Sequence, residues 1–304
     1  MTELRGCIPI LCTPFHDDLS IDVQSIGTQV DWAIAEGASG VSTLALASEG
    51  YKLTEAEREV VARTVIDAVD RRVPVVVSAD GTGHSIAIDR AVRAAEWGAD
   101  ALMVLPPSFV KPDRRSLFDY YAMIGRAVEI PVMIQDAPQL TGVSMGPGLW
   151  AELANEVPTI RYVKAEGTPQ GATISETLRL GAGKLAMFCG WGGLGALDAF
   201  ERGAIGSMPA VNFTRLFAEV QLAFDAGNVS IATKRFNGEL PYSLWAMQSL
   251  DFSISAAKRE LLHLGVISSA AVREPVQILD DISHRQLNSW IENHVRNAAN
   301  ELSE

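Results

Sequence analysis

Short apolar runs alternate with longer stretches of helical periodicity along the first two thirds of the chain. The runs are rich in Val, Ile, Leu and Met, and Gly, Pro or a charged residue bounds them, as is typical of buried strands. Eight runs are found, at 7–12, 41–46, 73–78, 101–105, 131–135, 160–164, 185–189 and 204–208. The stretches between them, such as 23–36 and 55–70, mix alanine with charged residues at helical spacing.

This repeated order predicts an α/β fold, a closed (β/α)₈ TIM barrel, because apolar strands that alternate with helices form a parallel sheet covered by those helices. An open doubly wound sheet is the alternative. Glycines at the joints between helix and strand, as in 36–41 and 96–102, support the alternation. After Asn212 only helical stretches follow. We therefore predict a catalytic barrel over residues 1–225 and a C-terminal helical extension over residues 226–304.

Composition excludes several classes of function. The chain has 304 residues, 48% of them hydrophobic, and a net charge of −12, which argues against disorder and against nucleic acid or an anionic membrane as a partner. The N-terminal segment shows neither a signal-peptide pattern nor a membrane-spanning run. Cys7, Cys12 and Cys189 are scattered, so no disulfide framework is expected and a reducing, cytoplasmic location fits. The five histidines have no metal-ligand spacing, and no metal is predicted.

In a parallel barrel the chemistry lies at the carboxyl ends of the strands. Lys164 ends the sixth apolar run, where a cation is costly unless it is paired, exposed or neutral. Glu166 follows two residues later and points to the same side in extended chain, so it could exchange protons with the amine. A solvated ion pair at the rim of the barrel would give the same sequence pattern.

Two other motifs are weaker. The string of glycines from Gly190 to Gly195 matches a dinucleotide fingerprint. It lies in the seventh unit instead of the first, and no acidic residue ends the next strand, so we expect no dinucleotide and assign these glycines to the approach of an anionic substrate or to a crowded barrel rim. Ser48 and Glu49 follow the second run, where the Ser48 hydroxyl could hold a carboxylate or only satisfy the backbone.

Six segments spread over the chain form a combined signature. They are GCIPILCTPF (6–15), SEGYKLTEAER (48–58), DGTG (80–83), PPSFVKP (106–112), QDAP (135–138) and YVKAE (162–166). On these motifs the chain resembles, over about residues 4–300, the dihydrodipicolinate synthase and N-acetylneuraminate lyase superfamily of class I aldolases. The resemblance implies a barrel with a C-terminal helical extension, a homo-oligomer that is commonly a tetramer, and a Schiff-base lysine that matches Lys164.

Departures from the superfamily pattern narrow the expected reaction. The usual Gly-Thr-Thr-Gly-Glu loop is Ala-Leu-Ala-Ser-Glu at 45–49, the usual catalytic tyrosine is Gln135, and a Tyr-Tyr pair is replaced by Ser108 and Phe109. An amide cannot donate and recover a proton as a phenol does. The chain then resembles the 2-keto-3-deoxy sugar-acid dehydratases of the superfamily, such as those acting on L-2-keto-3-deoxyarabonate, in which the Glu that matches Glu166 lies at the substrate.

The expected site combines these observations. Its predicted members are Lys164, Glu166 and Gln135 as catalytic residues, and Ala47, Ser48, Gly190 and Pro209 as substrate-binding residues. A small 2-keto acid is the expected partner, and no organic cofactor is needed. Two alternatives stay open. One is a pyruvate-dependent aldol cleavage or a condensation like that of dihydrodipicolinate synthase, and the other is a non-catalytic ligand-binding barrel.

Overall fold

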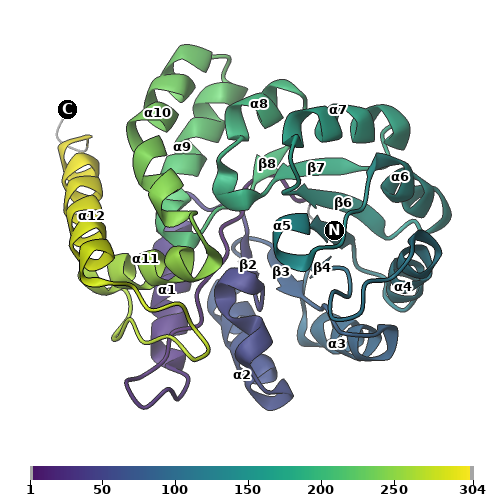
Figure 1. The fold of residues 1–304 in the computed structure, drawn as a ribbon, viewed down its shortest axis with the longest axis horizontal. Helices are drawn as coiled ribbons and strands as arrows, with labels where there is room; N and C mark the ends of the chain where they lie inside the picture. The colour runs from purple at the N-terminus through teal and green to yellow at the C-terminus, as the bar shows by residue number, and fades with distance from the viewer. Residues whose placement is uncertain (1–2, 302–304) are drawn as a thin grey trace.

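A computed structural model describes residues 3–301 (Figure 1). Eight parallel strands form one sheet in the order β1-β8-β7-β6-β5-β4-β3-β2. Their bounds are β1 (Gly6–Cys7), β2 (Val41–Thr43), β3 (Val75–Ser78), β4 (Ala101–Val104), β5 (Val132–Asp136), β6 (Ile160–Ala165), β7 (Ala186–Cys189) and β8 (Gly206–Ser207). Ile10, just after β1, bridges both to Ser42 of β2 and to Ala210 after β8. The sheet is therefore a closed barrel, as predicted, and the open doubly wound alternative is wrong.

Helices connect the strands and form a ring outside the barrel (Figure 1). They are α1 (Val23–Ala35), α2 (Glu55–Val69), α3 (His84–Trp97), α4 (Arg114–Arg126), α5 (Pro138–Thr141), α6 (Pro147–Glu156), α7 (Gln170–Gly181), α8 (Ala196–Glu201) and α9 (Thr214–Asp225). Side chains at the first turn fix where helices start. At α2, for example, Thr54 and Glu57 form a reciprocal capping box.

The first and last strands are shorter than the apolar runs that predicted them. The run at 7–12 keeps only Gly6–Cys7 as a strand, and the run at 204–208 keeps only Gly206–Ser207. Pro9 and Pro209 lack a backbone N–H, so neither can donate to a continuous ladder. Their neighbours still pair, because Ile8 N donates to Ser207 O and Ile10 N donates to Pro209 O.

Apolar side chains fill the inside of the barrel below the strand ends. Val76, Met103, Met133, Tyr162 and Phe188 belong to one buried cluster there. A larger cluster occupies the space between the sheet and the helices. Both faces of the central strands are thus buried, which explains why their sequences are continuous apolar runs without alternation.

The C-terminal extension consists of α10 (Val229–Ala246), α11 (Leu250–His263) and α12 (Asp281–Glu301). Helix α10 packs along α9, and α11 packs against the short 3-10 turns η1 (Leu46–Ser48) and η4 (Val211–Phe213) on the barrel. Figure 1 shows the three helices gathered on one side of the barrel. Within residues 3–301, no helix is both long and apolar enough to span a bilayer.

Candidate active site

Lys164, Glu166 and Gln135 meet at the carboxyl ends of β5 and β6. The strand register pairs Gln135 with Lys164, and Glu166 follows on the same side of the chain. The Lys164 Nζ lies 3.1 Å from Glu166 Oε1, and the two side chains are 7% and 4% exposed. Gln135 Nε2 donates a hydrogen bond of 2.7 Å to the same Glu166 oxygen. This buried geometry does not agree with a solvated ion pair at the rim.

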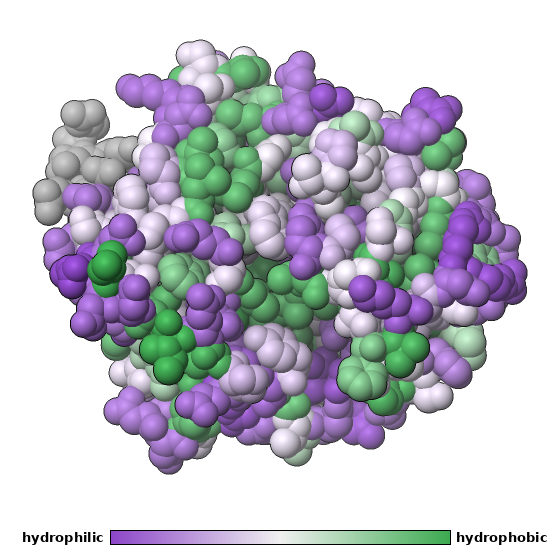
Figure 2. Space-filling view, in the orientation of Figure 1, coloured by the Kyte–Doolittle hydropathy of each residue, from purple (hydrophilic) through white to green (hydrophobic). Residues whose placement is uncertain are grey.

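These three side chains line a cavity at the mouth of the barrel. Its lining comprises Ile10, Ala45, Leu46, Ala47, Gln135, Leu140, Lys164, Glu166, Trp191, Gly192, Met208, Pro209, Ala210, Met247, Leu250 and Ser253. Figure 2 shows a hollow near the middle of the molecule's face with hydrophobic side chains around it. Of the predicted substrate-binding residues, Ala47 and Pro209 belong to this lining.

Gly190 contacts Glu166 and is not part of the lining as the structure describes it. Its N–H donates to the Ala165 carbonyl. A Cβ at Gly190 would lie only 2.4 Å from Glu166 Cγ, so glycine is needed here for the carboxylate side chain to take its place. Gln139 Nε2 also donates to the Glu166 carbonyl, at 2.6 Å. Backbone and side chain of Glu166 are thus both held.

Ser48 does not reach the cavity, contrary to the predicted contact of its hydroxyl with a substrate carboxylate. The hydroxyl is buried and donates instead to the Leu11 carbonyl, at 2.6 Å. Within the 3-10 turn η1, successive side chains point about 120° apart. Leu46 and Ala47 therefore line the cavity while Ser48 faces the interior of the fold.

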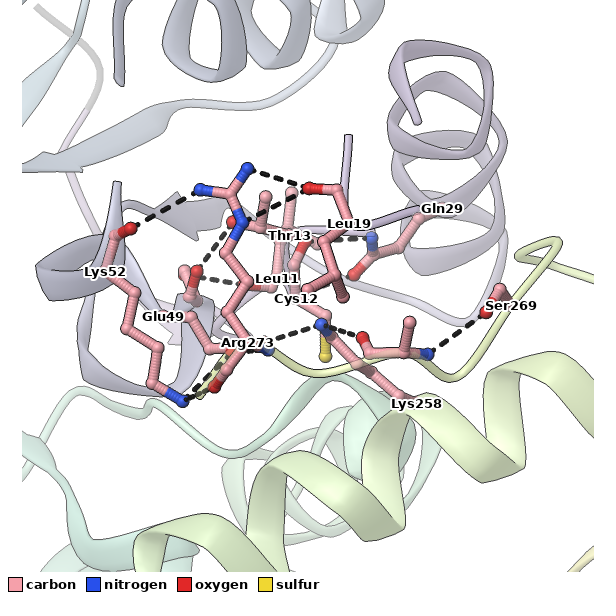
Figure 3. Close-up of polar contacts among 12 residues, drawn as sticks. Leu11, Cys12, Thr13, Leu19, Gln29, Glu49, Lys52, Lys258, Ser269 and Arg273 are labelled. Carbon is pink, nitrogen blue, oxygen red and sulfur yellow. Dashed lines mark hydrogen bonds and ion pairs between the residues drawn. The ribbon is translucent and has the colours of Figure 1, made fainter. Parts of the chain in front are cut away.

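Glu49 is the centre of a separate buried polar cluster (Figure 3). Lys258 Nζ donates to Glu49 Oε1 at 2.5 Å. Lys52 Nζ and the backbone N–H of Arg273 donate to Glu49 Oε2 at 3.1 and 3.0 Å. Burial lowers the pKa of Lys258, and the negative charge of Glu49 opposes that shift. The cluster joins the turn that lines the cavity to the C-terminal extension.

Asp136 is a second buried carboxyl, whose pKa is affected by the charge of Glu166. It follows Gln135 in β5, so its side chain points to the opposite face of the strand. Burial raises the pKa of Asp136 to about 7; hydrogen bonding to the backbone at Met145 opposes this, and the charge of Glu166 adds to it.

Sequence reasoning missed much of the cavity wall. Leu140 comes from α5. Met247, Leu250 and Ser253 come from the C-terminal extension, which in the sequence lies far after the last strand. The cavity thus crosses the boundary predicted at residue 225. The segment 190–195 contains a 3-10 turn, η3 (Trp191–Gly193), and leads into the short helix α8. Within residues 3–301, no group of three or more His, Cys, Asp or Glu side chains is placed to hold a metal ion.

Comparison with known proteins agrees with this architecture. The model of the Dihydrodipicolinate synthetase family matches residues 3–294. L-2-keto-3-deoxyarabonate dehydratase of Azospirillum brasilense is 30% identical, covering 93% of this chain and 92% of that protein. 4-hydroxy-tetrahydrodipicolinate synthase of Rhizobium meliloti is 33% identical, covering 90% and 92% of the two chains.

A solved structure from the same family is similar to this chain. YagE, a prophage protein of E. coli K12 described as a member of the dihydrodipicolinic acid synthase family and solved in complex with pyruvate, superposes with a TM-score of 0.89 at 26% identity. The superposition covers 96% of this chain and 99% of YagE. The chain belongs to the dihydrodipicolinate synthetase family and is a lyase with that family's barrel.

Proposed function

We propose that this lyase dehydrates a 2-keto-3-deoxy sugar acid through a Schiff base on Lys164. The observation that carries the proposal is the contact of 3.1 Å between the Lys164 amine and the Glu166 carboxylate inside the cavity. The likeness to the Azospirillum dehydratase supports the choice of reaction.

The first step is condensation of the Lys164 amine with the C2 ketone, which releases water. The protonated imine that results withdraws electrons from C3 far better than a ketone does, so the C3 proton becomes acidic. Removal of that proton gives an enamine. The electron pair of the enamine then expels the C4 hydroxyl, and hydrolysis of the imine frees the product and Lys164. The net change is the loss of one water from the substrate.

Glu166 is the group that moves the proton in this scheme. As a carboxylate it accepts the C3 proton, and as a carboxylic acid it donates the same proton to the departing C4 hydroxyl. One residue thereby serves as base and acid. Gln135 holds the carboxyl from one side through its Nε2.

Gln135 and Ala47 bind the remaining substrate groups in this proposal. The buried Oε1 of Gln135 has no hydrogen-bond partner within the described chain, and such an atom is costly unless a ligand hydroxyl donates to it. Ala47 lies near the start of the turn η1, where N–H groups have no acceptor within the turn, so its N–H is assigned to the substrate carboxylate. Pro209 forms an apolar part of the cavity wall against which the substrate packs.

Product analysis tests the proposal. The protein is incubated with a panel of 2-keto-3-deoxy acids, and the products are identified by mass. Loss of water from at least one acid supports dehydration. Release of pyruvate would replace it with aldol cleavage, and turnover only when pyruvate and an aldehyde are supplied together would point to condensation, which the likeness to the Rhizobium synthase favours. No turnover of any acid would overturn a catalytic role in favour of ligand binding.

A further inference from the structure

The charged and amide groups of the cavity lie together on one wall. Lys164, Glu166 and Gln135 lie together at the ends of β5 and β6. Among the other lining residues that the structure describes, Ser253 is the one whose side chain carries a hydroxyl, and none carries an amide or a charge. The rest of the lining is therefore apolar or aromatic over most of its surface.

Residues from four separate segments build this apolar wall. They are Leu46 of η1, Leu140 of α5, Trp191 of η3, and Met247 and Leu250 at the junction of α10 and α11. Leucine and methionine offer no hydrogen bonds of ordinary strength to a ligand. At the second loop, Ala45 and Ala47 likewise provide methyl groups only.

The glycine string explains how Met247 reaches the cavity. Gly192 has a φ of +63°, and a Cβ there would lie 2.6 Å from Met247 Sδ and 2.7 Å from its Cγ. The thioether thus rests directly on the backbone of η3. A side chain at position 192 would keep the C-terminal extension away from the mouth. The lack of a side chain at Gly192 therefore allows the apolar side chain of Met247 to lie over the site.

A polyhydroxylated substrate would leave hydroxyls unpaired against this wall. A buried hydroxyl without a partner loses its hydrogen bonds to water, whereas a methylene group in the same place gains from burial. Gln135 Oε1 and Glu166 can serve the C4 hydroxyl, and Ser253 can serve one more. A further hydroxyl on the chain finds no side-chain acceptor in the described lining, because the indole N–H of Trp191 can only donate.

We propose that the cavity selects 4-hydroxy-2-oxo acids whose carbon chain beyond C4 carries at most one hydroxyl, and discriminates against the polyhydroxylated chains of six-carbon sugar acids. The proposal rests on the proposed function, because it assumes that the substrate is held as an imine on Lys164. It adds what the far end of that substrate must be.

A pair of substrates with the same carbon skeleton tests this selectivity. 4-hydroxy-2-oxohexanoate and 2-keto-3-deoxygluconate both have six carbons, and only the second has hydroxyls on C5 and C6. Total consumption of each acid is measured, whichever bond breaks. We expect kcat/KM to be about 10-fold or more higher for the acid without the additional hydroxyls, in line with the usual effect of one unmatched group in an apolar pocket. Equal values, or a preference for the gluconate derivative, would overturn the proposal.

Two variants locate the effect on the wall. Met247→Gln keeps the length of the side chain but adds an amide, and it should reduce the ratio of the two kcat/KM values to about one third or less of its original size. Leu244→Gln adds the same group three positions earlier, in α10, at a side chain that is 52% exposed and outside the lining, and it should leave the ratio unchanged. An unchanged ratio in Met247→Gln, or an equal change in both variants, would contradict the assignment of this wall.

A separate measurement distinguishes failure of this inference from failure of the proposed function. Borohydride reduction in the presence of pyruvate reports imine formation without involving the far wall. If no adduct forms on Lys164, the proposed function fails and this inference with it. If the adduct forms and the gluconate derivative is nevertheless preferred, only the selectivity is wrong.

Discussion

The Lys164–Glu166 and Lys258–Glu49 pairs are both buried, and they differ in what surrounds them. Lys164 and Glu166 are 3.1 Å apart and line a cavity. Lys258 and Glu49 are 2.5 Å apart with side chains that are 0% exposed, and neither borders the cavity (Figure 3). Burial and pairing alone therefore do not mark a reactive lysine.

Hydrogen-bond saturation separates the two pairs. The Lys258 amine donates to both Glu49 and the Ala271 carbonyl, and it lies over the ring of Phe15. Glu49 in turn accepts from Lys52 and Arg273. The Lys164 amine has Glu166 on one side and the cavity on the other. A substrate carbonyl can approach Lys164 and cannot approach Lys258, which makes the first pair suited to chemistry and the second to structure.

Charge balance also differs. Around Lys164 one carboxyl, Glu166, accompanies one amine and borders the cavity, so the two groups can exchange a proton with a ligand. Around Glu49 two ammonium groups and a backbone N–H surround one carboxylate. That arrangement fixes the Glu49 side chain, whose backbone lies in the left-handed region at φ 54°.

The largest expected effect is on covalent trapping. Borohydride with pyruvate should place the adduct on Lys164 and leave Lys258 unmodified, as peptide mapping by mass would show. Lys164→Arg should abolish both the adduct and turnover, because a guanidinium keeps the charge but is no amine nucleophile at neutral pH. An adduct on Lys258, or one that persists in Lys164→Arg, would reverse the distinction between the pairs.

The next effect concerns the proton carrier. Glu166→Gln keeps size and hydrogen bonding but cannot exchange a proton, so dehydration should fall by about 10²- to 10⁴-fold. Imine trapping on Lys164 should persist in this variant, which separates loss of proton transfer from loss of the site. A rate near that of the unmodified protein would leave Glu166 as a partner in an ion pair only.

The reverse asymmetry is expected for stability. Lys258→Met leaves Glu49 buried without its main partner and should lower the free energy of unfolding by about 3–5 kcal/mol, measured by urea denaturation. Lys164→Met should lower it less, because Glu166 borders the cavity and keeps the hydrogen bond from Gln135 Nε2. Lys184→Met, at an exposed lysine, is the control and should stay within about 0.5 kcal/mol. Similar losses in the two buried variants would remove the comparison.

The contrast between the pairs also marks what the sequence could predict. Strand periodicity predicts that Lys164 lies at the end of β6, where parallel barrels have their active sites. Ser48 was misassigned because the sequence does not show which way each residue of a 3-10 turn faces. Lys258 is separated from Glu49 by 209 positions, and Met247 reaches the cavity over a single glycine. No periodic pattern encodes such contacts between distant segments, so the strands and the position of Lys164 at a strand end could be predicted, whereas the far wall and the second pair could not.

The smallest expected effect concerns Asp136, the buried carboxyl next to Gln135 in β5. Burial raises the pKa of Asp136 from its ordinary value of 3.8 to about 7, so the folded protein binds this proton more tightly than the unfolded chain does. The resulting contribution to stability is complete below about pH 4 and is lost as the pH rises to about 7.

Asp136→Asn removes the titration, and the free energy of unfolding of the variant relative to the unmodified protein should increase by on the order of 2 kcal/mol between pH 5 and pH 8. Urea denaturation at the two pH values measures that difference. Asp67→Asn, at an exposed aspartate of α2, should show no such pH dependence. If Asp136→Asn matched the control, Asp136 would be ionised throughout this range, and burial would not raise its pKa as expected.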